Sequence, residues 1–209
     1  MRLLKKPLAA ASFGIFLLVG CASDEGAKKE NTVTENSTDG EKKPQGATRI
    51  ADDAFDPAAF EKRDLDLNGD GKADAYQFLT KGKPEDVLVV RKEIDVNFDG
   101  NIDIIRTMDE KGNLIQERFD HDFDGRIDVV NIFERGSLVR KEYDTNYDGT
   151  VDMWRFFDNA VIARKEADMN FDGKVDLWEY YEKGQIDRVG IDRNADGVVD
   201  DWQTAAGEG

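Results

Sequence analysis

The sequence predicts an all-β protein in which tandem β-hairpin repeats of about 24 residues form an elongated antiparallel meander. Three observations predict this fold class. An acidic nine-residue motif occurs six times, short segments of alternating apolar and polar residues separate its copies, and no stretch keeps a helical period. The starts of the copies lie 29, 25, 24, 24 and 24 residues apart, so we expect one structural unit per copy.

The motif is Asp-x-Asn/Asp-x-Asp-Gly-x-x-Asp, and its copies are residues 66–74, 95–103, 120–128, 144–152, 168–176 and 192–200. In such a loop, alternate side chains at positions 1, 3 and 5 point inward, and Gly at position 6 makes a sharp turn. A single Asp-Gly would be explained by a hairpin turn alone. Six copies that keep Asp at positions 1, 5 and 9 indicate metal ligands as well.

The segment after each motif has the alternation of a β-strand with one apolar face. Ten residues after each motif start there is an apolar residue, namely Tyr76, Ile105, Val130, Trp154, Trp178 or Trp202. The next residue is polar in every copy: Gln77, Arg106, Asn131, Arg155, Glu179 or Gln203. An aromatic row at strand spacing is more often a core face than a ligand platform, so we expect it to form the core.

A second strand precedes each following motif and carries arginine at positions 91, 140, 164 and 188, with Gln116 in the remaining copy. We expect each of these residues to share a face with the aliphatic residue two positions earlier. The arginines either lie over the aromatic row and pair with Glu93, Glu142 and Glu166, or are solvated residues that prevent aggregation of strand edges. The sequence leaves both interpretations open.

A unit of this length cannot bury its own apolar face, so the copies must pack on one another. A parallel solenoid would bring the acidic loops within ~4.8 Å, whereas an antiparallel meander would space them by ~9.6 Å. Each loop has a full ligand set of its own, and closely spaced charged loops would repel, so we favour the meander. All six loops would then line one edge, with short turns at 110–113, 134–137 and 182–185 along the other.

The motif fits calcium, which takes six to eight oxygen ligands from carboxylates, carbonyls and waters. Zinc prefers His or Cys, and the single histidine, His121, lies at the variable second position. We expect up to six calcium ions, bound by side chains at positions 1, 3, 5 and 9 and by the carbonyl at position 7. The predicted ligands, copy by copy, are Asp66, Asn68, Asp70, Lys72 and Asp74; Asp95, Asn97, Asp99, Asn101 and Asp103; Asp120, Asp122, Asp124, Arg126 and Asp128; Asp144, Asn146, Asp148, Thr150 and Asp152; Asp168, Asn170, Asp172, Lys174 and Asp176; and Asp192, Asn194, Asp196, Val198 and Asp200.

The first six motif positions resemble the calcium loops of EF-hands, dockerins and thrombospondin type 3 repeats. An EF-hand also needs a bidentate Glu at position 12, where this chain has Glu only once, at Glu179. The helices of dockerins and the cysteines of thrombospondin repeats are missing too. Over residues 66–200 the chain most resembles bacterial envelope lipoproteins with tandem EF-hand-like repeats. This resemblance implies calcium binding and no particular activity.

The N-terminus has the features of a secretory signal peptide. A basic segment, 1–7, precedes an apolar run at 8–19 that is too short to span a bilayer. The sequence Leu18-Val19-Gly20-Cys21 resembles a lipobox, whose cysteine is acylated; a stray cysteine beside an ordinary signal peptide is the alternative. Ala22 favours the outer membrane, by resemblance to enterobacterial sorting rules, if the source is diderm. Because Cys21 is the only cysteine, a disulfide framework is excluded.

We therefore expect five segments: a lipoprotein signal peptide (1–20), a disordered acylated tether (21–48), an N-terminal cap (49–64), six calcium-loop β-repeats (65–204) and a tail (205–209). The tether has too few large aliphatic residues to order itself. In the cap, Asp56 and Pro57 predict the start of a short helix. Ile50, Phe55 and Phe60 would cover the first edge of the repeat array.

Net charge limits the partners of this chain. It is −16, and removal of Arg2, Lys5 and Lys6 with the signal peptide would make it −19 (−16 − 3). Such acidity argues against nucleic acid and against polybasic attachment to anionic lipid, so membrane contact is expected through the N-terminal lipid alone.

These patterns predict a non-enzymatic, calcium-binding protein that is lipid-anchored in the cell envelope and acts as a structural spacer or interaction surface. The alternative is a calcium-dependent partner-binding component of a surface adhesion, motility or secretion assembly, whose protein partner the sequence does not identify. An enzyme is not expected, because one His and no unlipidated Cys leave no distinct catalytic set.

Overall fold

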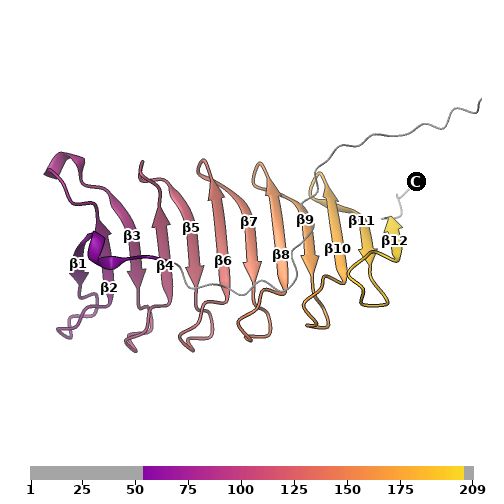
Figure 1. Ribbon diagram of the computed structural model, residues 1–209, viewed down its shortest axis with the longest axis horizontal. Coiled ribbons are helices and arrows are strands. Elements are labelled where there is room, and N and C mark those ends of the chain that lie inside the picture. Colours follow the sequence, from indigo (N-terminus) through magenta and orange to yellow (C-terminus); the bar gives the residue numbers. More distant parts are fainter. Residues whose placement is uncertain (1–53, 205–209) are drawn as a thin grey trace, which may run out of the picture. The chain divides into compact units, whose positions relative to one another are not determined.

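The computed structural model describes residues 54–204, which form one sheet of twelve antiparallel strands (Figure 1). Each strand pairs with its neighbours in the chain, so the order in the sheet is the order in the sequence. The predicted all-β antiparallel meander is confirmed, and the sheet is open, with β1 and β12 at its ends. Among residues 54–204, no helix is long and apolar enough to cross a membrane.

The strands are four to seven residues long. They are β1 (Glu61–Leu65), β2 (Ala75–Leu79), β3 (Val89–Ile94), β4 (Ile104–Met108), β5 (Leu114–Phe119), β6 (Val129–Glu134), β7 (Ser137–Tyr143), β8 (Met153–Asp158), β9 (Val161–Ala167), β10 (Leu177–Glu182), β11 (Gln185–Ile191) and β12 (Asp201–Thr204). Two single turns of 3-10 helix, η1 (Pro57–Ala59) and η2 (Pro84–Asp86), complete the described elements.

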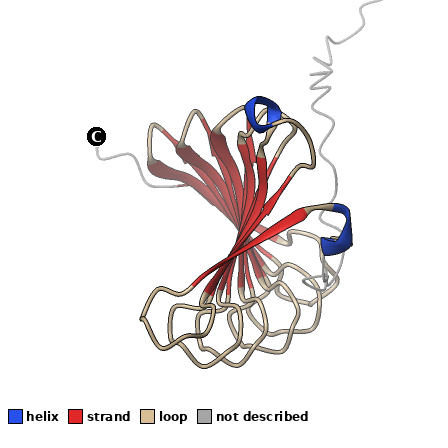
Figure 2. Ribbon diagram, turned by 90° about the vertical axis from the view of Figure 1, so that its left-hand side faces the viewer, coloured by secondary structure: helices blue, strands red, loops and turns tan. Residues whose placement is uncertain are grey.

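The two edges of the sheet carry different connections. Each acidic motif joins an odd-numbered strand to the next even-numbered one, and we call these connections loops 1 to 6 in chain order. All six lie along one edge, while the even-to-odd turns lie along the other (Figure 1). Viewed along the sheet, the strands turn progressively about its axis and the loops stay on one side (Figure 2). The predicted placement of the loops and turns is confirmed.

One face of the sheet, here called the aromatic face, combines aromatic residues of even strands with charged residues of odd strands. Residues that pair directly across strands point to the same face. Trp154 pairs with Glu142 and Glu166, and Phe156 pairs with Arg140 and Arg164. The aromatic face therefore contains two rows that run across the strands, one through Trp154 and one through Phe156.

The buried core lies where this face meets the loops. Val151, Trp154, Val175 and Trp178 form a buried cluster, and Phe156, Tyr180 and Val199 pack against it. Val151, Val175 and Val199 occupy position 8 of loops 4, 5 and 6. Within residues 54–204 no second layer covers the apolar face of the sheet, and loops 4, 5 and 6 each contribute one aliphatic side chain to that core. The expectation that the aromatic row forms the core is confirmed for Trp154 and Trp178.

The arginines of the odd strands both cover aromatic rings and pair with glutamates. The Arg164 guanidinium lies 4.2 Å from the Phe156 ring centroid and 3.1 Å from a carboxylate oxygen of Glu166, which is only 2% exposed. Arg91 is buried and pairs with Glu93 at 2.6 Å. The interpretation of solvated arginines is therefore wrong at these two positions.

A β-bulge changes the relation between each arginine and the preceding aliphatic residue. Arg164 pairs with Phe156, whereas Ile162 pairs with Phe157, because the register shifts between Phe156 and Phe157. Phe156 and Phe157 are adjacent and point to opposite faces. The expectation that Ile162 and Arg164 share a face is therefore wrong; the bulge leaves Ala163, which lies between them, as an extra residue with no paired residue on β8.

The segment before the first loop differs from the predicted cap. Asp56 is the N-cap of η1, and its side chain accepts a hydrogen bond from Ala58 N at 3.0 Å, as predicted. The helix ends after one turn, and β1 then forms the first edge of the sheet. The expected boundary between the cap and the repeats, at residue 64, falls within β1. Phe55 packs on Phe60 and Phe78 at ring-centroid distances of 5.2 and 4.9 Å, so it covers part of a face and not the edge. Ile50, the signal peptide, Cys21, the tether and the tail lie outside the described residues.

Candidate metal-binding loops

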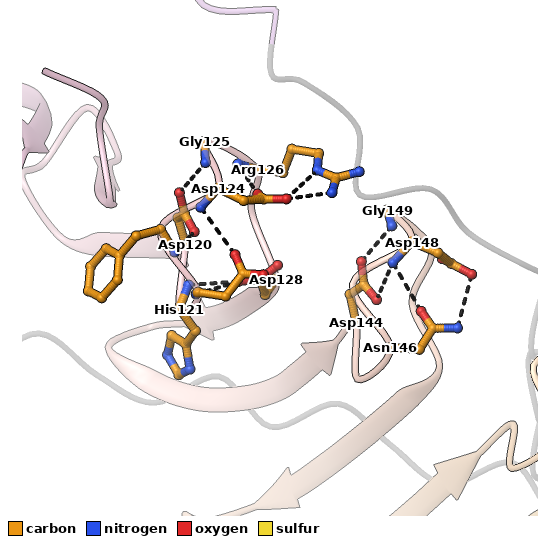
Figure 3. Close-up of polar contacts among 12 residues, drawn as sticks. Asp120, His121, Asp124, Gly125, Arg126, Asp128, Asp144, Asn146, Asp148 and Gly149 are labelled. Carbon is orange, nitrogen blue, oxygen red and sulfur yellow. Dashed lines mark hydrogen bonds and ion pairs between the residues drawn. The ribbon is translucent and has the colours of Figure 1, made fainter. Parts of the chain in front are cut away.

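The aspartate at position 1 organises each loop through its two carboxylate oxygens. In loop 3, Asp120 Oδ1 accepts a hydrogen bond from Phe123 N and Oδ2 accepts one from Gly125 N, both at 2.7 Å (Figure 3). The bond from the position-6 glycine is present in all six loops. Position 1 thus fixes the loop backbone around a carboxylate that is buried in loops 2 to 6.

The aspartate at position 9 closes the loop from the other side. In loop 3, Asp128 Oδ2 accepts hydrogen bonds from His121 N at 2.6 Å and Asp122 N at 3.4 Å (Figure 3). Positions 2 and 3 donate in the same way in the other five loops. Burial raises the pKa of Asp128, against the lowering effect of these two hydrogen bonds. Position 9 therefore braces the first residues of the loop.

Positions 3, 5 and 7 form a chain of hydrogen bonds on the outer side of each loop. In loop 4, Asp148 N donates to Asn146 Oδ1 at 3.0 Å, and Thr150 N donates to Asp148 Oδ1 at 2.8 Å. The other five loops repeat both bonds. Hydrogen bonding holds the pKa of Asp148 below its usual range, and the largest cause is the Asn146 amide. Hydrogen bonds thus fix the predicted side-chain ligands of each loop against its backbone. Among residues 54–204, three carboxylates close enough to hold one metal ion are found in loop 3, and its position-9 aspartate, Asp128, is not one of them.

Two backbone positions in each loop have positive φ. The glycine at position 6 was predicted to make the turn, and its φ is 88° in Gly149. Position 4 also has positive φ, including 64° in Phe123 and Tyr147 and 60° in Ala195. Phe, Tyr and Ala have no special preference for this region, so residue type gave no signal for position 4. The carboxylate at position 1 stabilises the conformation by accepting the position-4 N–H in five of the loops.

Loop 3 shows the arrangement of acidic groups most clearly. The carboxylates of Asp120, Asp122 and Asp124 each have an oxygen within 4.8 Å of the others, a group that could hold a metal ion. It is the one loop with Asp rather than Asn at position 3. Since the other loops share its hydrogen-bond pattern, each places an amide oxygen where Asp122 has a carboxylate oxygen.

A buried atom in loop 2 supports the fit of a cation. Asp103 is 1% exposed, and its Oδ2 accepts a hydrogen bond from Val96 N at 2.7 Å. Its Oδ1 is buried and has no hydrogen-bond partner within residues 54–204. A buried carboxylate oxygen without a partner is costly, and a bound cation would supply the missing interaction. An all-oxygen ligand set with this feature fits a hard divalent ion.

Backbone hydrogen bonds join each loop to the next, which the sequence did not reveal. Asp168 N, at position 1 of loop 5, donates to Asp152 O, at position 9 of loop 4, at 2.7 Å. Equivalent bonds of 2.8–2.9 Å join the other four neighbouring pairs of loops. No residue pattern marks these bonds, because they follow from strand pairing. They form a continuous connection between the six candidate sites.

A scan against models of known protein families finds no match for this chain, and a search of curated proteins finds no match either. The assignment of the loops therefore rests on their geometry and chemistry.

Proposed function

We propose that this protein is a calcium-binding, lipid-anchored envelope protein whose sheet is a spacer or interaction surface stabilised by calcium. The observation that carries the proposal is the sixfold recurrence of one hydrogen-bonded loop with oxygen side chains at positions 1, 3, 5 and 9. Loop 3, where the carboxylates of Asp120, Asp122 and Asp124 converge, is its clearest instance.

Calcium is favoured over other divalent ions by the ligand chemistry. The loops offer carboxylate and amide oxygens, with no cysteine and with His121 at a position that contributes only its backbone N–H to the loop. Magnesium demands a tight octahedral set and keeps several waters, whereas calcium accepts six to eight oxygens in an adaptable shell. Exposed positions 3 and 5 leave room for water ligands.

The loop geometry favours a structural role for the ion over a switch. Positions 1 and 9 are tied to backbone N–H groups, and the loop ends are tied to strands, as in the bond from Asp152 N to Tyr143 O at 2.8 Å. Calcium binding would offset the repulsion among the carboxylates without a large change in the loop backbone. Binding free energy is then folding free energy for the whole sheet.

The lipid anchor remains a proposal that rests on Cys21 and the segment before it. Acylation of Cys21 would hold the repeat sheet at a membrane through the 21–48 tether, and the net charge of −16 disfavours electrostatic contact with anionic lipid. Labelling of cells with a radioactive fatty acid should mark the protein, and Cys21→Ser should abolish both the label and sedimentation with membranes. Equal labelling of the two proteins would contradict the anchor.

Calorimetric titration of the mature chain with calcium tests the metal proposal. We expect a stoichiometry approaching six, and weaker binding of magnesium. The loop variant replaces all six position-5 aspartates by asparagine, which keeps an acceptor oxygen for the position-7 N–H and should bind calcium more weakly; these residues are Asp70, Asp99, Asp124, Asp148, Asp172 and Asp196. Absence of calcium binding by the unmodified chain, or equal binding by the loop variant, would overturn the proposal.

A second candidate function is a calcium-dependent partner-binding component of a surface adhesion, motility or secretion assembly. The single sheet favours it, because among residues 54–204 no second layer covers Arg106 and Arg155 on the face opposite the aromatic one. Affinity capture from detergent-solubilised envelopes, with calcium and with chelator, tests it. Recovery of the same proteins by an Arg106→Glu/Arg155→Glu variant would count against this surface.

A further inference from the structure

On the face opposite the aromatic one, eight polar residues form a line across strands β3 to β10, which we call the basic row. Its members pair directly from strand to strand and are, in order, Lys92, Arg106, Glu117, Asn131, Lys141, Arg155, Lys165 and Glu179. Direct pairing places them on one face at the strand spacing of ~4.8 Å. All are at least partly exposed except Asn131, which is buried.

The basic row has an excess of positive charge in a strongly acidic protein. It contains five basic and two acidic residues, so its net charge is +3 (5 − 2), whereas that of the chain is −16. Lys141, Arg155 and Lys165 are consecutive, and like charges directly opposite on neighbouring strands destabilise a sheet. On the aromatic face, by contrast, arginines are compensated by glutamates of the same strand, as in Arg140–Glu142 at 2.8 Å.

Part of this charge lacks a partner within the protein. Arg106 pairs with Glu117 at 2.8 Å, and Lys165 pairs with Glu179 at 3.2 Å. Within residues 54–204, Lys92, Lys141 and Arg155 form no ion pair.

Arg155 lacks a hydrogen-bond acceptor for one of its donors among the described residues. Its Nε is buried and has no hydrogen-bond acceptor within residues 54–204, while its guanidinium lies 5.2 Å from the ring centroid of Tyr143. A guanidinium with an unsatisfied donor, directly opposite Lys141, which also forms no ion pair within these residues, is suited to an external anion.

We propose that the basic row binds a linear acidic polysaccharide that carries a carboxylate on each sugar. Three of its cations, Lys141, Arg155 and Lys165, lie on neighbouring strands at about the strand spacing of 4.8 Å, which suits a chain whose negative charges recur at a similar interval. Arginine binds carboxylates in a bidentate fashion, and Tyr143 offers an amphipathic ring beside Arg155.

The surroundings of the row favour this class of polyanion over nucleic acid. The acidic loops lie along the adjacent edge of the sheet, and the chain as a whole is strongly negative. Nucleic-acid binding needs a broad basic footprint that neutralises many phosphates, and a single line of cations does not provide it. The proposal depends on the register of the sheet and goes beyond the calcium function.

The test uses the mature chain and a galacturonic acid decamer, with affinity measured in calcium and in chelator. A variant with Lys141→Gln, Arg155→Gln and Lys165→Gln should bind at least about tenfold more weakly, since three exposed ion pairs are lost. A control with Lys81→Gln, Arg135→Gln and Lys183→Gln removes the same charge from the turn edge and should change the affinity less than about twofold. The methyl-esterified decamer should not bind, because it lacks the carboxylates.

Thermal melting of the row variant and the binding of competing ligands are two further readouts. The row variant removes like-charge repulsion but also the Lys165–Glu179 ion pair, and these two effects oppose each other. Its melting temperature should therefore stay close to that of the unmodified chain, and weaker binding by a variant that is still folded cannot be attributed to unfolding. Equal affinity of the row and control variants would overturn the proposal, as would tighter binding of single-stranded DNA than of the decamer. Binding that requires calcium and is insensitive to the row variant would assign the polysaccharide to the loops instead. If the unmodified chain binds the decamer in chelator but does not bind calcium, only the calcium function is refuted.

Discussion

The two edges of the sheet reverse the chain in different ways. On the turn edge, three connections are two-residue turns in which both residues have positive φ: Arg135-Gly136, Asn159-Ala160 and Lys183-Gly184. On the loop edge, each reversal takes nine residues and at least three carboxylates that accept backbone hydrogen bonds. Reversal alone needs only the short turn. The longer, highly charged connection therefore indicates a second task at the loop edge, for which cation binding is the function proposed above.

Removal of calcium should have the largest effect, because it acts on the loop edge six times. At about 10 mM calcium and a dissociation constant of about 1 mM, each site would contribute about 1.4 kcal/mol, or about 8 kcal/mol for six. At about 2–4 °C per kcal/mol for a domain of this size, the melting temperature should fall by at least roughly 15 °C in chelator. Scanning calorimetry in calcium and in EDTA measures this shift. Superimposable curves would show that the loop edge needs no cation.

The next largest difference in stability is expected between an Asp→Asn substitution on the loop edge and one on the turn edge. Asp103→Asn should cost about 1–3 kcal/mol in calcium, since the buried amide would lack an acceptor or the ion would lose a ligand. Asp109 is on the turn edge and accepts hydrogen bonds from Lys111 N and Asn113 N through one oxygen, which Asn can replace. Asp109→Asn should therefore change stability by less than about 0.5 kcal/mol. Urea denaturation of both variants gives the comparison, and equal costs would contradict it.

A Gly→Ala pair tests the backbone requirement of the loop edge. Gly149 has φ +88°, where a Cβ is strained although no atom lies within 4 Å of it, so Gly149→Ala should cost about 1–2 kcal/mol. Gly82, on the turn edge, lies outside the positive-φ region and also has open space. Gly82→Ala should be neutral or stabilising by up to about 1 kcal/mol, through the entropy of the unfolded chain. The two denaturation midpoints should move in opposite directions, or only the first should move.

A substitution at one position of the turn edge should increase the stability of the protein. Ala160 has φ +64° in the β8–β9 turn, where the two other two-residue turns have Gly. Ala160→Gly should stabilise the protein by about 0.5–1 kcal/mol, because glycine adopts this conformation without strain. As a control, Ala167→Gly at a regularly paired position of β9 should destabilise it by at least about the same amount. A loss of stability in Ala160→Gly would contradict the assignment of strain to this turn.

The smallest expected effect concerns a carboxylate of the turn edge. Hydrogen bonds from the side chain and backbone of Asn113 hold the pKa of Asp109 below its usual range. The folded state thus favours the ionised form, so the contribution of Asp109 to stability is present above the pKa of the unfolded chain and is lost as the pH falls through the folded value. An NMR titration should show this depressed pKa, and Asn113→Ala should raise it toward that of an unperturbed aspartate. An unchanged value in the variant would exclude Asn113 as the cause.

Local features of the sequence predicted much of the fold. The 24-residue period, the alternation around Trp154 and Trp178, and the turn glycines led to the antiparallel meander and to the common loop edge. The short range of these signals is the reason: strand alternation and turn formation depend on neighbouring residues. The candidate ligands were equally accessible, because positions 1, 3, 5 and 9 of one loop come from nine consecutive residues.

Other features arise from pairing between strands, and the sequence contains no mark of them. The bulge that separates Ile162 from Arg164 depends on the register of β8 and β9. The bond from Asp168 N to Asp152 O joins two loops that are separated by a full hairpin. The alignment of Lys141, Arg155 and Lys165 on one face also depends on how three strands are matched.

The sequence by itself thus determined the repeat, its strands and the oxygen-rich loops, since each is encoded within one copy of about 24 residues. Only the tertiary structure decided that the sheet is open, that its loops are linked through their backbones, and that unpaired cations line up on one face. The physical reason is the hydrogen-bond register between strands. A shift of one residue would move every side chain to the other face, and the residue pattern of a single copy does not show where a bulge shifts that register.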